Sequence, residues 1–98
     1  MTLVYGDFMK TDEQNRLVLT IGTYADLAKH RVELQDGLKL VFYNEDEHDD
    51  GTRDDLIVEG VAEYDESQGR WVARVNWNDI KNMSQLSDEE RERMGLQS

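Results

Sequence analysis

Carboxylates are concentrated in one short part of this 98-residue chain. Of all the residues in the sequence, these are the strongest candidates for binding a cation or a basic partner. Eleven acidic residues and a single basic one lie within residues 45–66. The remainder is balanced, with six acids and five bases in residues 1–44 and five of each in residues 67–98. Nearly the whole net charge of −11 therefore belongs to one stretch. Neighbouring carboxylates repel one another, and solvation, bound cations or a basic partner relieve that repulsion.

The densest part of this stretch, residues 45–55, is called the acidic loop here, and its spacing partly matches a calcium-binding loop. Counting from Asp46, Asp50 falls at position 5 and a glycine at position 6. Position 3 is His48, and position 12 is Ile57 where a calcium loop needs a bidentate Glu, so the calcium motif is not met. Asp46, His48 and Asp50 are the metal-ligand candidates, whereas a solvated histidine is the simpler interpretation of His48.

A basic protein surface is the partner that the acidic loop suits best, because opposite charges steer an encounter. Trp77 ends an alternating apolar strand beside polar residues, so it is either core, core edge or an interface anchor with Tyr43 or Tyr64. Nucleic acid and anionic membranes are disfavoured as direct partners, since the chain has no Lys/Arg cluster. The candidate partner-binding residues are Glu45, Asp46, Glu47, Asp49, Asp50, Asp54, Asp55 and Trp77.

Four interpretations of the acidic loop stay open. The first is a protein-interaction module that presents an anionic loop, and an enzyme subunit without its own active site would look the same. The second is an inhibitor or nucleic-acid mimic that occupies a basic cleft, although a mimic needs rigid carboxylates. The third is a weak divalent-cation binder. The fourth is a solvated, mobile loop that only keeps the protein in solution.

Catalytic chemistry finds little support in the residue types. There is no Cys, hence no thiolate nucleophile and no sulfur-ligated zinc. No phosphate-cradling glycine loop, dinucleotide fingerprint or Gly-x-Ser-x-Gly turn occurs. A general acid needs a desolvating pocket to raise its pKa, and a chain this short has room for one core. We therefore expect no enzyme and no cofactor.

Short strands separated by polar turns are the elements that must position these residues. Residues 3–10 and 16–21 predict an N-terminal hairpin, and Thr23 predicts the cap of a short helix over residues 24–30. Residues 38–43 alternate, with Leu38, Leu40 and Phe42 on one face and Lys39, Val41 and Tyr43 on the other.

Residues 56–64 and 70–77 predict a second hairpin around Gly69. Charged side chains face each other across it, with Glu59 and Glu63 on one strand and Arg70 and Arg74 on the other. The register that decides which of them pair is left open by the sequence.

A capping box predicts a C-terminal helix, with Ser87 at the cap, Glu90 three residues on and Gly95 as its end. About seven residues are too few for a stable isolated helix in water. This helix therefore docks through Leu86 and Met94, frays, or becomes ordered on a partner. The domain organisation that follows is one β-rich domain over residues 1–86 and a short helix or tail over residues 87–98.

These elements predict a mainly β protein: a small antiparallel five-stranded, partly open barrel with one short helical turn before the central strands and a short C-terminal helix. Over residues 34–84 the chain resembles small barrels of the Src-homology-three type, which also occur in uncharacterised bacterial proteins. The resemblance rests on Leu34-Gln35-Asp36-Gly37-Leu38, on residues 60–65, and on Trp71-Val72-Ala73-Arg74 with Trp77. It implies a fold and no function.

The expected compartment is the cytoplasm. The first residues lack the basic and apolar regions of a secretory signal, and no apolar run approaches the ~18 residues that span a membrane.

Overall fold

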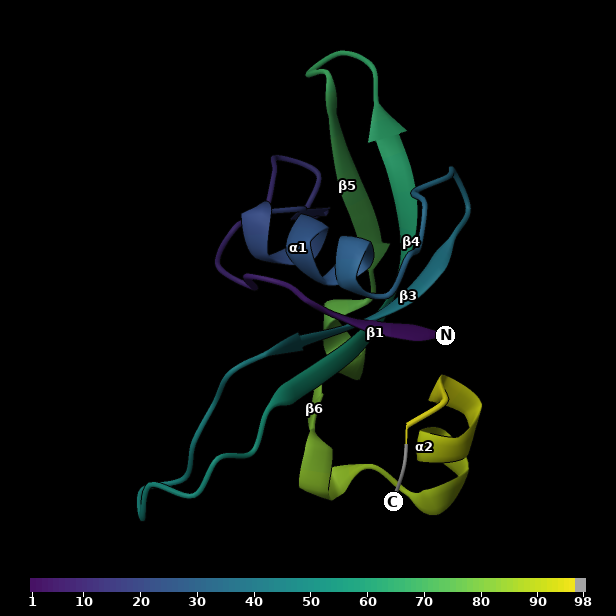
Figure 1. The fold of residues 1–98 in the computed structure, drawn as a ribbon. Coiled ribbons are helices and arrows are strands. Elements are labelled where there is room, and N and C mark those ends of the chain that lie inside the picture. The colour runs from purple at the N-terminus through teal and green to yellow at the C-terminus, as the bar shows by residue number, and fades with distance from the viewer. Residues whose placement is uncertain (97–98) are drawn as a thin grey trace.

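The computed structural model describes residues 1–96, and its centre is a six-stranded, partly open sheet. The spatial order is β1-β3-β4-β5-β2, and β6 pairs with β4 (Figure 1). The strands are β1 (Thr2–Tyr5), β2 (Leu17–Val18), β3 (Lys39–Asn44), β4 (Leu56–Asp65), β5 (Arg70–Val75) and β6 (Lys81–Asn82). The helices are α1 (Ile21–Lys29), the 3-10 turns η1 (Trp77–Asp79) and η2 (Met83–Gln85), and α2 (Asp88–Met94).

The predicted N-terminal hairpin is wrong, and with it the prediction of an entirely antiparallel sheet. β1 pairs in parallel with β3, from Thr2 opposite Leu40 to Tyr5 opposite Tyr43. The chain leaves this ladder at the buried Gly6, and of the predicted first strand only Lys10 forms a backbone hydrogen bond with the predicted partner strand, through its carbonyl and the Val18 N–H. A side chain at Gly6 would meet the side chains of Leu17 and Phe42, so the turn away from β3 is packed tightly against the core.

Helix α1 begins one turn earlier than the sequence predicts. Its N-cap is Thr20, and Thr23 lies inside the first turn, fully buried, with its hydroxyl accepting the N–H of Thr20 at 3.3 Å. The first turn of the helix packs against the ring of Tyr5 at Gly22. A Cβ at this position would lie 2.7 Å from Cδ2 of that ring, so a larger residue would not fit there.

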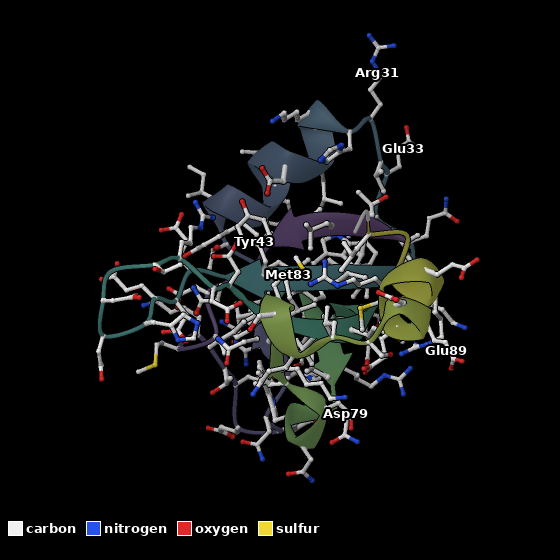
Figure 2. The ribbon with its side chains drawn as sticks, turned by 90° about the horizontal axis from the view of Figure 1, so that it is seen from below. Arg31, Glu33, Tyr43, Asp79, Met83 and Glu89 are labelled. Atoms are coloured by element: carbon white, nitrogen blue, oxygen red, sulfur yellow. The ribbon has the colours of Figure 1, made fainter. Side chains whose placement is uncertain are left out.

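Two apolar clusters lie on opposite faces of the sheet, where the sequence predicts a single core. The alternation in β3 is confirmed, since Leu40 and Phe42 face one cluster and Val41 faces the other. The first cluster, under α1, is Val4, Leu17, Leu19, Leu27, Leu40, Phe42, Val58, Ala62 and Ala73. The second is Val41, Ile57, Leu86 and Met94, with Tyr43 and Met83 packed against it. Figure 2 views this second face and shows Tyr43 and Met83 near its middle.

The C-terminal helix forms as predicted and docks on the second face. The Ser87 hydroxyl accepts the Glu90 N–H at 3.1 Å, the Glu90 carboxylate accepts the Ser87 N–H at 3.0 Å, and Gly95 ends the helix with φ 76°. Leu86 and Met94, 7% and 6% exposed, complete the second cluster. Burial of the two side chains replaces the stability that so short a helix lacks by itself.

The hairpin of β4 and β5 resolves the register that the sequence leaves open. Asp65 lies opposite Arg70, and Glu63 reaches the diagonal Arg74 at 3.0 Å. Glu59 pairs with neither Arg70 nor Arg74 and instead contacts Arg93 of α2. The strand predicted to run to Trp77 ends at Val75, because Trp77 already belongs to η1.

A nearly buried guanidinium joins the N-terminal turn to this hairpin. Arg16 is 12% exposed in its side chain and contacts Asp12 at 2.8 Å, Asp65 at 3.0 Å and Glu63 at 3.3 Å. Asp12 and Asp65 are 7% and 8% exposed, so Arg16 is the charge that balances two carboxylates taken out of water.

Replacing Arg16 with Met should lower the melting temperature by more than about 10 °C, because it leaves Asp12 and Asp65 buried without a counter-charge. Arg74→Met is the matched control: it removes the same charge from a side chain that is 65% exposed and should change the melting temperature far less. Thermal unfolding of both variants checks this. Equal losses would show that Arg16 contributes only its formal charge.

The Glu90 cap predicts a specific acid sensitivity. The N–H of Ser87, followed by the ammonium of Lys81, lowers the pKa of Glu90 from 4.5 to about 2. The folded pKa lies below the unfolded one, so the stability from this cap is complete above about pH 4.5 and is lost as the pH falls toward 2. Glu90→Gln should flatten the pH dependence of unfolding in this range, whereas Glu89→Gln, an exposed neighbour, should leave it as in the wild type. Parallel curves for the two variants would contradict the assignment.

Candidate functional site

The acidic loop extends from the ends of β3 and β4 and forms a protrusion on one side of the molecule (Figure 1). The longest dimension of the protein, 42 Å, exceeds the other two, 25 and 24 Å. Backbone hydrogen bonds cross the loop: His48 N–H donates to Thr52 O at 2.8 Å, and Asp54 N–H donates to Asp46 O at 2.9 Å. Glu47 and Arg53 form a further bridge between the two arms. The loop is therefore an irregular hairpin.

The candidate acidic residues differ in burial. Glu45, Asp46, Glu47, Asp49 and Asp50 are exposed, Asp55 is half-buried and Asp54 is buried. The side chain of Asp50 accepts the Thr52 N–H at 2.9 Å and so shapes the tip. At the base Arg53, the single base of the loop, contacts Asp55 at 2.7 Å and Glu45 at 3.6 Å. The negative charge left uncompensated therefore lies toward the tip.

Asp54 is buried at the base of the loop, 7% exposed, and ties the loop to the body. Its carboxylate accepts the Ser84 hydroxyl at 2.5 Å and the Ser84 N–H at 2.9 Å, and His48 Nε2 lies 2.9 Å from the same carboxylate. The Ser84 hydroxyl, then the Ser84 N–H and the contact to His48, hold the pKa of Asp54 below its ordinary value. Asp54 is thus a structural anchor and is not available to a partner.

Asn82 and Met83 fasten both arms of the acidic loop to the segment before α2. The Asn82 amide donates to the Asp46 carboxylate at 3.2 Å and to Asp54 O at 2.8 Å. Met83 N–H donates to Asp55 O at 2.8 Å. Sequence reasoning missed Asn82 and Ser84, because a polar turn some 30 residues away carries no local signal of such a contact.

The three metal-ligand candidates are not brought together. Asp46 bonds Asn82, His48 contacts Asp54, and Asp50 bonds the backbone of Thr52. Over residues 1–96, no three His, Cys, Asp or Glu side chains are grouped in a way that would hold a metal ion.

Trp77, the remaining partner-binding candidate, is half-buried at the edge of the first cluster. Its ring packs edge-on against Phe8 at 5.5 Å, and its indole N–H donates to Asn15 O at 2.6 Å. Tyr43 and Tyr64, its proposed companions, stack on Tyr5 and Trp71 instead. The core-edge interpretation of Trp77 agrees with these contacts.

Comparison with protein-family models, curated proteins and solved structures finds no match to this chain. Among the helices in the described part of the chain, none is long and apolar enough to cross a bilayer.

Asp54→Ala should loosen the acidic loop, because it removes the acceptor of both Ser84 donors and the partner of His48. Amide exchange at His48 and Gly51, whose N–H groups bond within the loop, should accelerate by about tenfold or more. Asp49→Ala makes the same charge change at an exposed position and should leave these rates unchanged. Equal acceleration in both variants would mean that Asp54 acts only through its charge.

Proposed function

We propose that this protein is a cytoplasmic interaction module that presents the acidic loop to a basic surface of a partner protein. The observation that carries the proposal is the loop itself: a hydrogen-bonded protrusion with its exposed carboxylates at the tip and its buried carboxylate used as an anchor. The proposal assigns no catalytic step to this chain.

The charge distribution supports binding by electrostatic steering. The protrusion carries seven acids and one base within residues 45–55, which is more than half of the net charge of −11, so its field attracts a cationic patch and orients it toward the tip. Fixed carboxylates lose less side-chain and backbone entropy on binding than a mobile loop would. Such an encounter weakens as salt is added, since exposed charges are screened over about 10 Å near 0.1 M salt.

The test is a pull-down from the native cell at low salt with three forms of the tagged protein. The protrusion variant carries Glu47→Gln, Asp49→Asn and Asp50→Asn, which remove charge and keep shape. The control variant carries Glu13→Gln, Glu33→Gln and Glu66→Gln, which remove the same charge from exposed positions elsewhere.

The wild type and the control should retain a basic partner that the protrusion variant and high salt release. The same retention by all three forms, or retention that does not respond to salt, would refute the proposal.

A nucleic-acid mimic is the second candidate, and the hydrogen bonds across the acidic loop favour it over a mobile loop. A mimic needs exposed carboxylates in fixed positions, and the contacts of Asp46 and Asp50 restrain two of them. In the same pull-down, release of the retained partner by added double-stranded DNA selects the mimic. A divalent-cation binder is not proposed, because the three candidate ligands point to different partners.

We also propose that the sheet closes far enough to form a small barrel of the Src-homology-three type. Gly6 N–H donates to Tyr43 O of β3, and four residues later Lys10 O accepts the Val18 N–H of β2. A chain spans at most about 3.5 Å per residue, which brings the two edge strands of the sheet to within roughly 14 Å of each other. The order of long loop, tight turn and 3-10 turn after β3 supports the same assignment.

A further inference from the structure

β1 is an edge strand, and one of its residues presents an unpaired backbone to solvent. The parallel ladder places the N–H of Gly6 on Tyr43 O, so alternate residues Thr2 and Val4 face β3. The N–H and C=O groups of Leu3 and Tyr5 therefore point outward. An outward-facing row of this kind pairs readily with a further strand.

Only part of this edge is already occupied. The carboxylate of Asp26 in α1 accepts the N–H of Tyr5 at 2.8 Å and the hydroxyl of Tyr43 at 3.3 Å. Among the described residues, no side chain or backbone group bonds the outward N–H and C=O of Leu3. Leu3 is thus the position at which an incoming strand would exchange two hydrogen bonds with the protein.

A groove of about 620 Å³ runs along this edge. Helix α1 lies on one side of β1 and α2 on the other (Figure 1), and a side chain at Gly95, after the end of α2, would meet the backbone of Met1. The two helices leave the edge of β1 open between them, so an extended chain can reach it. The groove is lined by Met1, Thr2, Leu3, Asp26, Lys29, His30, Tyr43, Arg53, Asp55, Gly95 and Leu96.

Opposite charges mark the two ends of the groove. Lys29 and His30 end α1, which lies over the start of β1, and both are exposed. At the other end, the Asp26 carboxylate sits at Tyr5. Arg53 and Asp55 pair with each other there, and the exposed carboxylates of the acidic loop lie beyond this pair.

We propose that an extended segment of a basic protein binds along β1 as an added strand, hydrogen-bonded to Leu3, with its Lys and Arg residues at the Tyr5 end. This inference rests on the proposed function and names how the partner binds. β-strand addition supplies the backbone hydrogen bonds, and the acidic end of the groove and the loop beyond it select the basic side chains. The stretch over Lys29 and His30 takes uncharged or acidic residues.

A second copy of the chain is a poorer occupant of the groove. Two molecules that each carry a net charge of −11 repel one another, and Asp26 already covers one of the outward N–H groups that a paired β1 would use.

The probe is the synthetic peptide Lys-Lys-Val-Thr-Val-Thr-Val, and the control peptide has Pro in place of both Thr residues. Amide hydrogen exchange and NMR titration are measured on the full protein. The first peptide should bind and slow exchange at Leu3 by about tenfold or more, whereas Tyr5, which Asp26 already covers, should change little. The Pro peptide cannot donate these hydrogen bonds and should bind at least about tenfold more weakly.

The protrusion variant separates this inference from the proposed function. It should weaken the binding of the peptide while leaving the protection of Leu3 intact at saturation. Equal binding of both peptides, with shifts confined to residues 45–55, would overturn the inference and leave the proposed function standing. Protection of Leu3 that rises with protein concentration alone would overturn it in favour of a second copy.

Discussion

The buried carboxylate of Asp54 is the constraint on which the arrangement of this protein depends. It lies where the acidic loop leaves the sheet, and it accepts both donors of Ser84 while contacting His48. A carboxylate that is 7% exposed must be satisfied by hydrogen bonds, and here those donors come from the loop and from the segment that leads into α2. The direction of the acidic loop and the position of the C-terminal segment are thereby fixed together.

The body of the protein makes this arrangement possible. β3 and β4 are buried on both faces, so the second face needs a cover, and residues 83–96 supply it through Leu86 and Met94. Ser84 of this segment and Asn82 just before it lie at the base of the loop. The C-terminal segment therefore both covers the sheet and anchors the acidic loop. Burial of its apolar side chains stabilises the fold, and its hydrogen bonds set the orientation of the loop.

Local patterns predicted what depends on local chemistry. The alternation of residues 38–43, the hairpin around Gly69 and the cap at Ser87 were all correct, because side-chain direction and capping are properties of a few neighbouring residues. The pairing of β1 was not predictable in this way. Parallel pairing with β3 joins residues almost 40 positions apart, and no local pattern in residues 3–10 marks it. For the candidate site, the sequence predicts the concentration of charge but not how the loop is anchored. Asp54 cannot be told from the neighbouring acids in the sequence, and only its contact with Ser84 in the fold distinguishes it.

The central claim is that the acidic loop is held in one orientation in the free protein, and backbone ¹⁵N relaxation of the wild type tests it most directly. Order parameters across residues 46–54 should lie close to those of β3 and β4, near the value of about 0.85 that marks rigid backbone. Values below about 0.6 throughout residues 46–54, while β3 and β4 remain rigid, would show that the loop moves freely and would contradict the account.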